Sequence, residues 1–124
     1  MEKQTFSGNY EADIASLNLR LRVSESFDLV SRQIMIGSHR AMLWFIDGFI
    51  KDGLMEKIMS FMMNADEKKL KTVGTTREFA DAFVPYIETE VVNDFDRFET
   101  FLFSGALGMI VDGFKEAIII DVRT

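Results

Sequence analysis

Cysteine is absent from the 124 residues of the chain. Without thiols the chain can form no disulfide, no thiolate nucleophile and no zinc–thiolate site. The single histidine, His39, excludes any site that needs two imidazoles from one chain, such as the HExxH zinc motif. Serine–histidine–aspartate catalysis would have to pass through this one residue.

Long apolar runs and an excess of basic residues are missing as well. The longest apolar run, Ala41 to Ile46, is far shorter than the roughly 20 residues of a membrane-spanning helix. The N-terminus lacks the apolar stretch of a signal peptide. The net charge is −6, whereas a nucleic-acid-binding surface is basic. We therefore expect a soluble, cytosolic chain that binds no nucleic acid.

The residues that are present suffice for one packed domain. Hydrophobic residues make up 48% of the chain and charged residues 27%, which is typical of a globular protein and not of a disordered one. A chain of this length forms a single domain, here residues 1–124, and buries about two-thirds of its unfolded surface. The first eight residues are polar and small, so we predict a loose tail over residues 1–8.

Capping residues and helical spacing predict four helices. Asn9 precedes the first, and the reciprocal pair Thr75 and Glu78 forms a capping box before the third. Pro85 ends the third helix, and Asn93 or Asp94 caps the last. The lysine-rich residues 64–73 are interpreted as a solvated connection. The predicted helices span about residues 10–22, 52–63, 76–84 and 94–104.

Alternating or continuous apolar residues predict five strands, at residues 28–36, 41–46, 86–91, 107–111 and 114–122. The first two should form a hairpin. Asp112-Gly113 predicts a two-residue type I′ turn between the last two. The element order is helix, two strands, two helices, strand, helix, two strands. It indicates a mixed α/β (α+β) fold with one sheet and helices packed on it.

Three groups of residues could make contacts with other molecules. His39 and Arg40 at a turn could hold an anion, because arginine offers a planar fork of donors; the alternative is a solvent-exposed polar turn. The strand at 86–91 alternates, with Glu88 and Glu90 on its wet side. It should lie near a sheet edge, which is a possible pairing surface.

The third group is a cluster of methionines on the second predicted helix. Methionine adapts its shape to a partner, so this cluster could be a docking surface if the sheet does not cover it. The alternative is that the methionines fill the core, as the apolar face of an amphipathic helix ordinarily does. The members are Met55, Met59, Met62 and Met63.

Several short motifs follow one another in a specific order and spacing. They are Ser26 to Arg32, Ile36-Gly37, Arg40-Ala41, Phe45 to Phe49 with Lys51-Asp52, Phe103 to Gly105, Val111 to Gly113, and Ile120 to Thr124. Over about residues 25–124 this pattern resembles the N-terminal region of the GerA family of spore germination proteins. The Ser-Phe-Asp and Asp-Gly-Phe-x-Lys-Asp segments look more like the branch of stage V sporulation protein AF (SpoVAF).

The resemblance implies a non-catalytic domain on the cytosolic side of the spore inner membrane, joined to the membrane only through a missing C-terminal domain. Its partners would be other germination-protein subunits, the remainder of its own chain, or a small-molecule ligand, in germinant response and ion release. The resemblance places no catalytic, cofactor-binding or metal-binding residue on this sequence. Two alternatives stay open, namely a free-standing soluble sensor of a small ligand and a small hydrolase working through His39.

Overall fold

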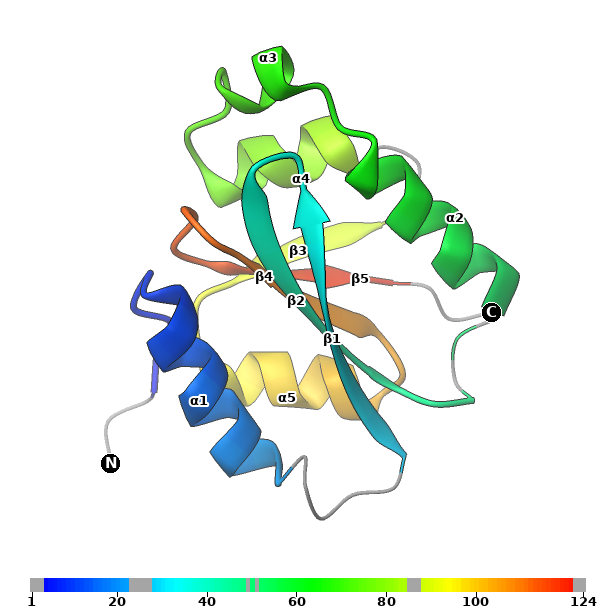
Figure 1. Cartoon of the computed structure of the whole chain (residues 1–124). Coiled ribbons are helices and arrows are strands. Elements are labelled where there is room, and N and C mark those ends of the chain that lie inside the picture. Colours follow the sequence, from blue (N-terminus) through cyan, green and yellow to red (C-terminus); the bar gives the residue numbers. More distant parts are fainter. Residues whose placement is uncertain (1–3, 23–27, 49, 51, 85–87, 122–124) are drawn as a thin grey trace.

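The computed structural model describes residues 4–22, 28–48, 50, 52–84 and 88–121. These residues form one open sheet with helices packed on it (Figure 1). The elements are α1 (Tyr10–Leu21), β1 (Leu29–Ile36), β2 (His39–Ile46), α2 (Asp52–Met63), α3 (Glu67–Leu70), α4 (Thr76–Phe83), β3 (Thr89–Val92), α5 (Phe95–Phe103), β4 (Leu107–Val111) and β5 (Ala117–Ile120). The strand order is β1-β2-β4-β5-β3, and every neighbouring pair is antiparallel. The predicted mixed α/β fold is confirmed.

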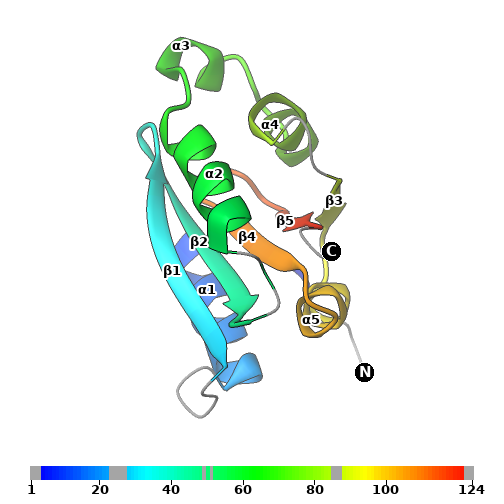
Figure 2. The same cartoon turned by 90° about the vertical axis from the view of Figure 1, so that its right-hand side faces the viewer.

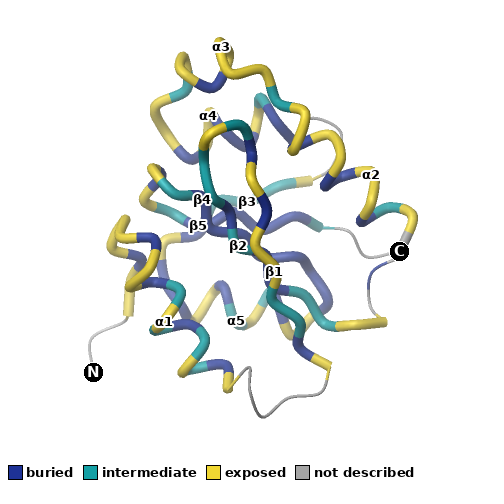
Figure 3. Tube along the Cα trace, viewed as in Figure 1, coloured by how far each residue is buried: buried dark blue, intermediate teal, exposed yellow. Residues whose placement is uncertain are grey.

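Helices cover both faces of the sheet. Figure 2 shows α2, α3 and α4 on one side and α1 and α5 on the other. Each layer encloses its own cluster of buried side chains, which we call the α2–α4 core and the α1–α5 core. In Figure 3 the buried residues follow the middle strands and the inner sides of the helices.

Strand alternation divides the central side chains between the two cores. On β4, Met109 lies in the α2–α4 core and Ile110 in the α1–α5 core. On β2, Leu43 and Trp44 divide in the same way. Successive side chains of a strand point to opposite faces, so a strand covered on both faces must be apolar throughout. This explains the unbroken apolar run that the sequence shows at residues 41–46.

Local capping chemistry sets the helix boundaries, as the sequence predicts. The Asn9 side chain accepts a hydrogen bond from the Ala12 N–H at 3.0 Å, and Asp94 accepts one from the Arg97 N–H at 2.8 Å. Thr75 and Glu78 form the complete capping box of α4. The predicted stop at Pro85, the first two residues of the 86–91 strand and residue 122 lie outside the described residues.

Two predicted connections differ from the structure. The segment 64–73 contains the short helix α3, where the Asp66 side chain caps the first turn and Leu70 is buried. Asp112 and Gly113 do form a turn, closed by the hydrogen bond from the Phe114 N–H to the Val111 carbonyl oxygen at 3.1 Å. The predicted type I′ hairpin is wrong, because Gly113 but not Asp112 has a positive φ, and pairing between β4 and β5 begins only at Ile110 and Ala117. The longer loop between them tucks the ring of Phe114 into the α2–α4 core.

The N-terminal residues 4–8, which we call the N-terminal arm, are not a loose tail. Phe6 is 1% exposed and packs on Phe95, with ring centroids 4.6 Å apart. Its N–H donates to the Asn93 carbonyl oxygen, and the Phe95 N–H donates to the Gln4 carbonyl oxygen, both at 2.9 Å. A single phenylalanine among polar residues has no periodicity, so the sequence gives no signal of this contact. Residues 1–3 lie outside the described residues.

Candidate binding groove

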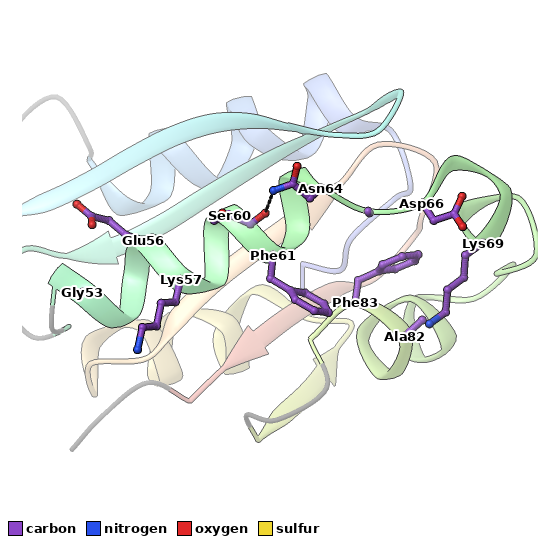
Figure 4. A pocket seen from close by; sticks show the side chains of 11 residues that line it. Gly53, Glu56, Lys57, Ser60, Phe61, Asn64, Asp66, Lys69, Ala82 and Phe83 are labelled. Carbon is purple, nitrogen blue, oxygen red and sulfur yellow. Dashed lines mark hydrogen bonds between the residues drawn. The ribbon is translucent and has the colours of Figure 1, made fainter.

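A groove runs along α2 and is closed on its other side by α3 and α4 (Figure 4). Its volume is about 900 Å³. The lining residues are Gly53, Glu56, Lys57, Ser60, Phe61, Asn64, Ala65, Asp66, Lys69, Ala82 and Phe83. Because five of them share one stripe of α2, that stripe forms one wall of the groove.

The methionines of α2 lie mostly on the opposite stripe, against the sheet. Met55, Met59 and Met62 are 9%, 7% and 0% exposed and belong to the α2–α4 core, whereas Met63 is 49% exposed. Three of the four predicted contact methionines are therefore placed as core filler in this chain. The sequence did not indicate the groove wall, because the residues of that stripe are largely polar. The one signal was Phe61, a large apolar residue on the polar side of the helix.

Two aromatic rings project into the groove, Phe61 from α2 and Phe83 from α4 (Figure 4). Phe61 is 43% exposed, and Phe83 is buried except where it lines the groove. Exposed aromatic surface inside a concavity offers a contact for an apolar side chain of another molecule.

Two lysines lie beside these rings. Lys57 extends from α2 on the groove side, and the Lys69 ammonium lies 5.8 Å from the centroid of the Phe83 ring. Of the two acidic lining residues, Glu56 extends to the opposite side of α2 in Figure 4. The Asp66 carboxylate accepts the Lys68 backbone N–H at 2.9 Å as the cap of α3. The groove therefore has two aromatic faces and a margin that carries both acidic and basic side chains.

Arg40, a predicted anion contact, is bound by carboxylates of the chain itself. Its Nη2 donates to Asp112 Oδ2 at 2.9 Å and its Nη1 to Glu11 Oε1 at 3.0 Å, while the guanidinium lies over the Tyr10 ring. These hydrogen bonds, first from Glu11 and then from Asp112, raise the pKa of Arg40 above its ordinary value. An external anion would have to displace both carboxylates from Arg40, which disfavours binding there. The anion site stays a prediction.

His39, the other predicted anion contact, is held at the base of the β4–β5 loop. Its Nδ1 lies 2.8 Å from the carbonyl oxygen of Asp112, and its ring centroid is 5.7 Å from that of Phe114. Both residues begin β2 and do not lie in the turn where the sequence placed them, and their contacts join this strand to the β4–β5 loop. A structural role accounts for both contacts.

The predicted edge position of the strand containing Glu90 is confirmed, because β3 is the last strand of the sheet. Glu88 just before it is exposed, and Glu90 forms an ion pair with Arg97 of α5. Arg77 of α4 donates to the Thr89 carbonyl oxygen at 3.4 Å, on the outer edge of the strand. The edge is thus short and partly covered, which disfavours pairing with another strand.

Within the described ranges, no three acidic or histidine side chains gather closely enough to hold a metal ion. The described part of the chain also contains no helix with the length and apolarity that crossing a membrane requires.

The fold and the groove define an α/β domain whose candidate site is a surface groove between helices. A family model described as Bacillus/Clostridium GerA spore germination protein matches residues 17–124. The chain therefore belongs to the GerA family of spore germination proteins, as its motifs indicate. A comparison with curated proteins finds no match.

A solved structure has the same fold as this chain. It is the crystal structure of the N-terminal domain of the A subunit of the Bacillus megaterium spore germinant receptor GerK3. The TM-score is 0.78 at 16% sequence identity, and the match covers 100% of this chain and 50% of the other. The chain thus spans half the length of that crystallised domain.

Proposed function

We propose that this chain is a non-catalytic, cytosol-facing domain of a spore germination membrane protein. It acts by contact with other germination-protein subunits or with further parts of its own protein, in the steps that lead from nutrient response to ion release. The observation that carries this proposal is the GerA family match over residues 17–124. The hydrogen bond and ring contact of the partly buried His39 favour a structural residue over the hydrolase alternative.

Loss of the whole gene tests the role in germination. Spores that lack the gene are expected to release their ions more slowly when nutrients are added, while their response to a nutrient-independent trigger stays normal. Unchanged kinetics with every nutrient tested would overturn the proposal. Reintroduction of the full-length gene is the control.

Within the family, we propose that the chain belongs to the SpoVAF branch, on the strength of its Ser-Phe-Asp and Asp-Gly-Phe-x-Lys-Asp segments. Some of these residues lie outside the described ones, and the crystallised relative is a receptor A subunit whose 16% identity shows the fold alone. The gene deletion distinguishes a SpoVAF-like protein from a receptor A subunit. Loss of the response to one nutrient alone would favour a receptor A subunit, whereas slower ion release with all nutrients would favour SpoVAF.

The absence of cysteine makes the cytosolic orientation testable. A Thr72→Cys substitution places one thiol at an exposed position of this region in the full-length protein. We expect a membrane-impermeant maleimide to label it only after the spore inner membrane is permeabilised, and the parent protein reports any background. Labelling of the intact membrane from outside would contradict the proposal.

The groove also favours a second candidate, a sensor domain for a small ligand. Its volume of about 900 Å³ lies within the range of small-molecule sites, roughly 300–1,000 Å³. A ligand at a hundred times its Kd would stabilise the folded chain by about 2.7 kcal/mol. A thermal-unfolding screen of amino acids, sugars and nucleotides tests this, and a flat response across all three classes would remove this candidate.

A further inference from the structure

Two Asp-Gly sequences follow strands of the sheet in the same way. Asp47-Gly48 comes directly after β2 and Asp112-Gly113 directly after β4, and each is preceded by a β-branched residue and followed by phenylalanine. Both glycines have a positive φ, 90° at Gly48 and 98° at Gly113. The two aspartates thus have nearly the same neighbours in the sequence, so a difference in their reactivity must come from the fold.

The carboxylate of Asp112 is held by Arg40. Its Oδ2 accepts hydrogen bonds from Arg40 Nη2 at 2.9 Å and from Arg40 Nε at 3.1 Å. The space beside the next residue is also occupied, because a Cβ atom on Gly113 would lie 3.2 Å from His39 Nδ1. Hydrogen bonds between a guanidinium and a carboxylate are among the strong ones in proteins. The Asp112 side chain can therefore rotate only after these bonds break.

The carboxylate of Asp47 has no such restraint. Within the described ranges, no residue forms a hydrogen bond or an ion pair with it. Asp47 and Gly48 are both exposed, and a Cβ atom on Gly48 would meet nothing within 4 Å. The one contact is made by the backbone, where the Asp47 N–H donates to the Asp28 carbonyl oxygen at 2.7 Å. The Asp47 side chain is therefore free to turn toward the backbone nitrogen of Gly48.

We propose that Asp47 is a site of spontaneous isomerisation to isoaspartate, and that Arg40 protects Asp112 from the same reaction. The Gly48 nitrogen attacks the side-chain carboxyl carbon of Asp47, and a C–N bond closes a five-membered succinimide ring. The carboxyl hydroxyl group and the amide proton leave together as water. Glycine favours this step because it has no side chain to obstruct its nitrogen.

A second water molecule completes the reaction. It adds to the backbone carbonyl carbon of the succinimide ring and breaks the original bond between that carbon and the Gly48 nitrogen. The main chain then runs through the side-chain carboxyl carbon of Asp47, and the former backbone carbonyl becomes the free carboxylate. One water molecule is released and one is consumed, so the reaction needs no other reactant.

Isomerisation adds one methylene carbon to the main chain between β2 and α2. Ile50 in this connection is 8% exposed and belongs to the α2–α4 core. The longer main chain must displace Ile50 or the start of α2, so the isomerised chain should unfold at a lower urea concentration than the parent. An unchanged midpoint would overturn this consequence. The inference concerns the chemistry of the folded chain and does not rest on the role in germination.

Peptide mapping of the 124-residue chain after prolonged warm incubation at mildly acidic pH tests the two sites. Trypsin separates them, because the peptides that contain Asp47 and Asp112 end at Lys51 and Lys115. Isoaspartate changes the retention time and the backbone fragment ions of a peptide but not its mass. We expect it to accumulate at Asp47 at least about tenfold faster than at Asp112, where charged hydrogen bonds must break before the attack.

The same incubation in urea is the internal control. Without the fold, both sites should isomerise at similar rates, because their neighbours in the sequence are nearly the same. Equal rates in the folded chain, or a faster reaction at Asp112, would overturn the protection by Arg40. If the unfolded chain reacts while Asp47 of the folded chain does not, the proposed site falls.

Substitution of Arg40 tests the protection directly. Arg40→Gln should raise the rate at Asp112 and leave the rate at Asp47 unchanged. Arg40→Lys keeps the charge but not the two donors on one carboxylate oxygen, so it should cause a smaller rise and serves if Arg40→Gln does not fold. The matched control Glu11→Gln removes the other partner of Arg40 and should change neither rate. An unchanged rate at Asp112 in both folded Arg40 variants would overturn the proposal.

Discussion

Gly108 lies where the central strand β4 passes under the ring of Phe98. A Cβ atom at this position would lie 2.4 Å from Phe98 Cζ, so the ring would have to move. Phe98 is fully buried and meets Trp44 edge-on, with ring centroids 5.6 Å apart. Interiors are close-packed, so the missing side chain of glycine is what admits the aromatic ring.

We predict that Gly108→Ala destabilises the protein by about 1–3 kcal/mol, the usual cost of overpacking a core. Urea unfolding followed by Trp44 fluorescence measures the change, since Trp44 is the single tryptophan and is buried. Adding Phe98→Leu should offset part of the loss by making room. Gly53→Ala, whose Cβ meets nothing within 4 Å in a helix, is the control and should be neutral or stabilising. Equal stability of Gly108→Ala and the parent would contradict the close packing.

Tyr10 is a buried phenol beneath Arg40. Its hydroxyl donates to Gln33 Oε1 at 3.0 Å, and the Arg40 guanidinium lies 4.7 Å from its ring centroid. Burial raises the pKa of Tyr10 to about 12, against a smaller lowering by Arg40. The folded state thus holds the phenol proton more tightly than the unfolded state, whose tyrosine pKa is about 10.

We predict that the stability contributed by Tyr10 is fully present below about pH 10 and is lost as the pH rises through about 12. In a Tyr86→Phe variant Tyr10 is the sole tyrosine, and its tyrosinate absorbance should titrate near pH 12 when folded and near 10 in denaturant. Titration of the folded variant near its ordinary pKa would refute the prediction. Tyr10→Phe should abolish the signal and flatten this part of the stability profile.

At the scale of elements, the N-terminal arm completes the α1–α5 core. Asp13, itself buried in α1, accepts hydrogen bonds from the Ser7 and Gly8 N–H groups and from the Ser7 hydroxyl. This anchorage places Phe6 among the aromatic rings of α5. The arm lies before the stretch matched by the family model, which begins at residue 17.

We predict that Phe6→Ala costs about 3–5 kcal/mol, as expected for emptying a fully buried phenylalanine site. Thr5→Ala is the matched control. Its exposed side chain can be removed while the backbone bridge to Asp94 remains, so the change should stay within about 0.5 kcal/mol. Urea unfolding of both variants measures the two costs, and similar small values would mean that the arm adds little stability.

The elements that could be predicted from the sequence are those specified by neighbouring residues. Asn9, Thr75 and Asp94 cap helices through bonds that span three residues, so a local motif suffices. The turn at Asp112-Gly113 could be predicted, but the length of the loop around it could not, because distant contacts decide that length. The Asp112 N–H donates to the Arg40 carbonyl oxygen at 2.8 Å, which continues the hydrogen bonding between β2 and β4 to the first residue of the expected turn.

The candidate site likewise depends on contacts between residues that are distant in the sequence. The sequence shows that α2 has an apolar stripe, but whether Met59 faces a sheet or a partner depends on residues far along the chain. The groove exists only because α3 and α4 return beside α2 and bring Lys69 and Phe83 to the side of Phe61. Periodicity within one helix contains no information about such a neighbour.

At the scale of the whole molecule, the two cores share one sheet and therefore depend on each other. All five residues of β4 are buried, and the strand supplies Met109 to one core and Ile110 to the other. β4 is also paired on both sides, with β2 and with β5. Loss of either helical layer would expose one face of this strand to water, so neither core is stable alone.

We therefore predict a single cooperative unfolding transition. In a urea titration followed by NMR, the Trp44 indole reports the α1–α5 core, and the Ile118 methyl groups report the α2–α4 core. Their midpoints should coincide, as two-state unfolding of a small domain requires. Phe6→Ala, which removes contacts from the α1–α5 core alone, should lower both midpoints by the same amount. If only the Trp44 transition moved, the two layers would be independent units, and the sheet would not couple the groove on one face to the N-terminal arm on the other.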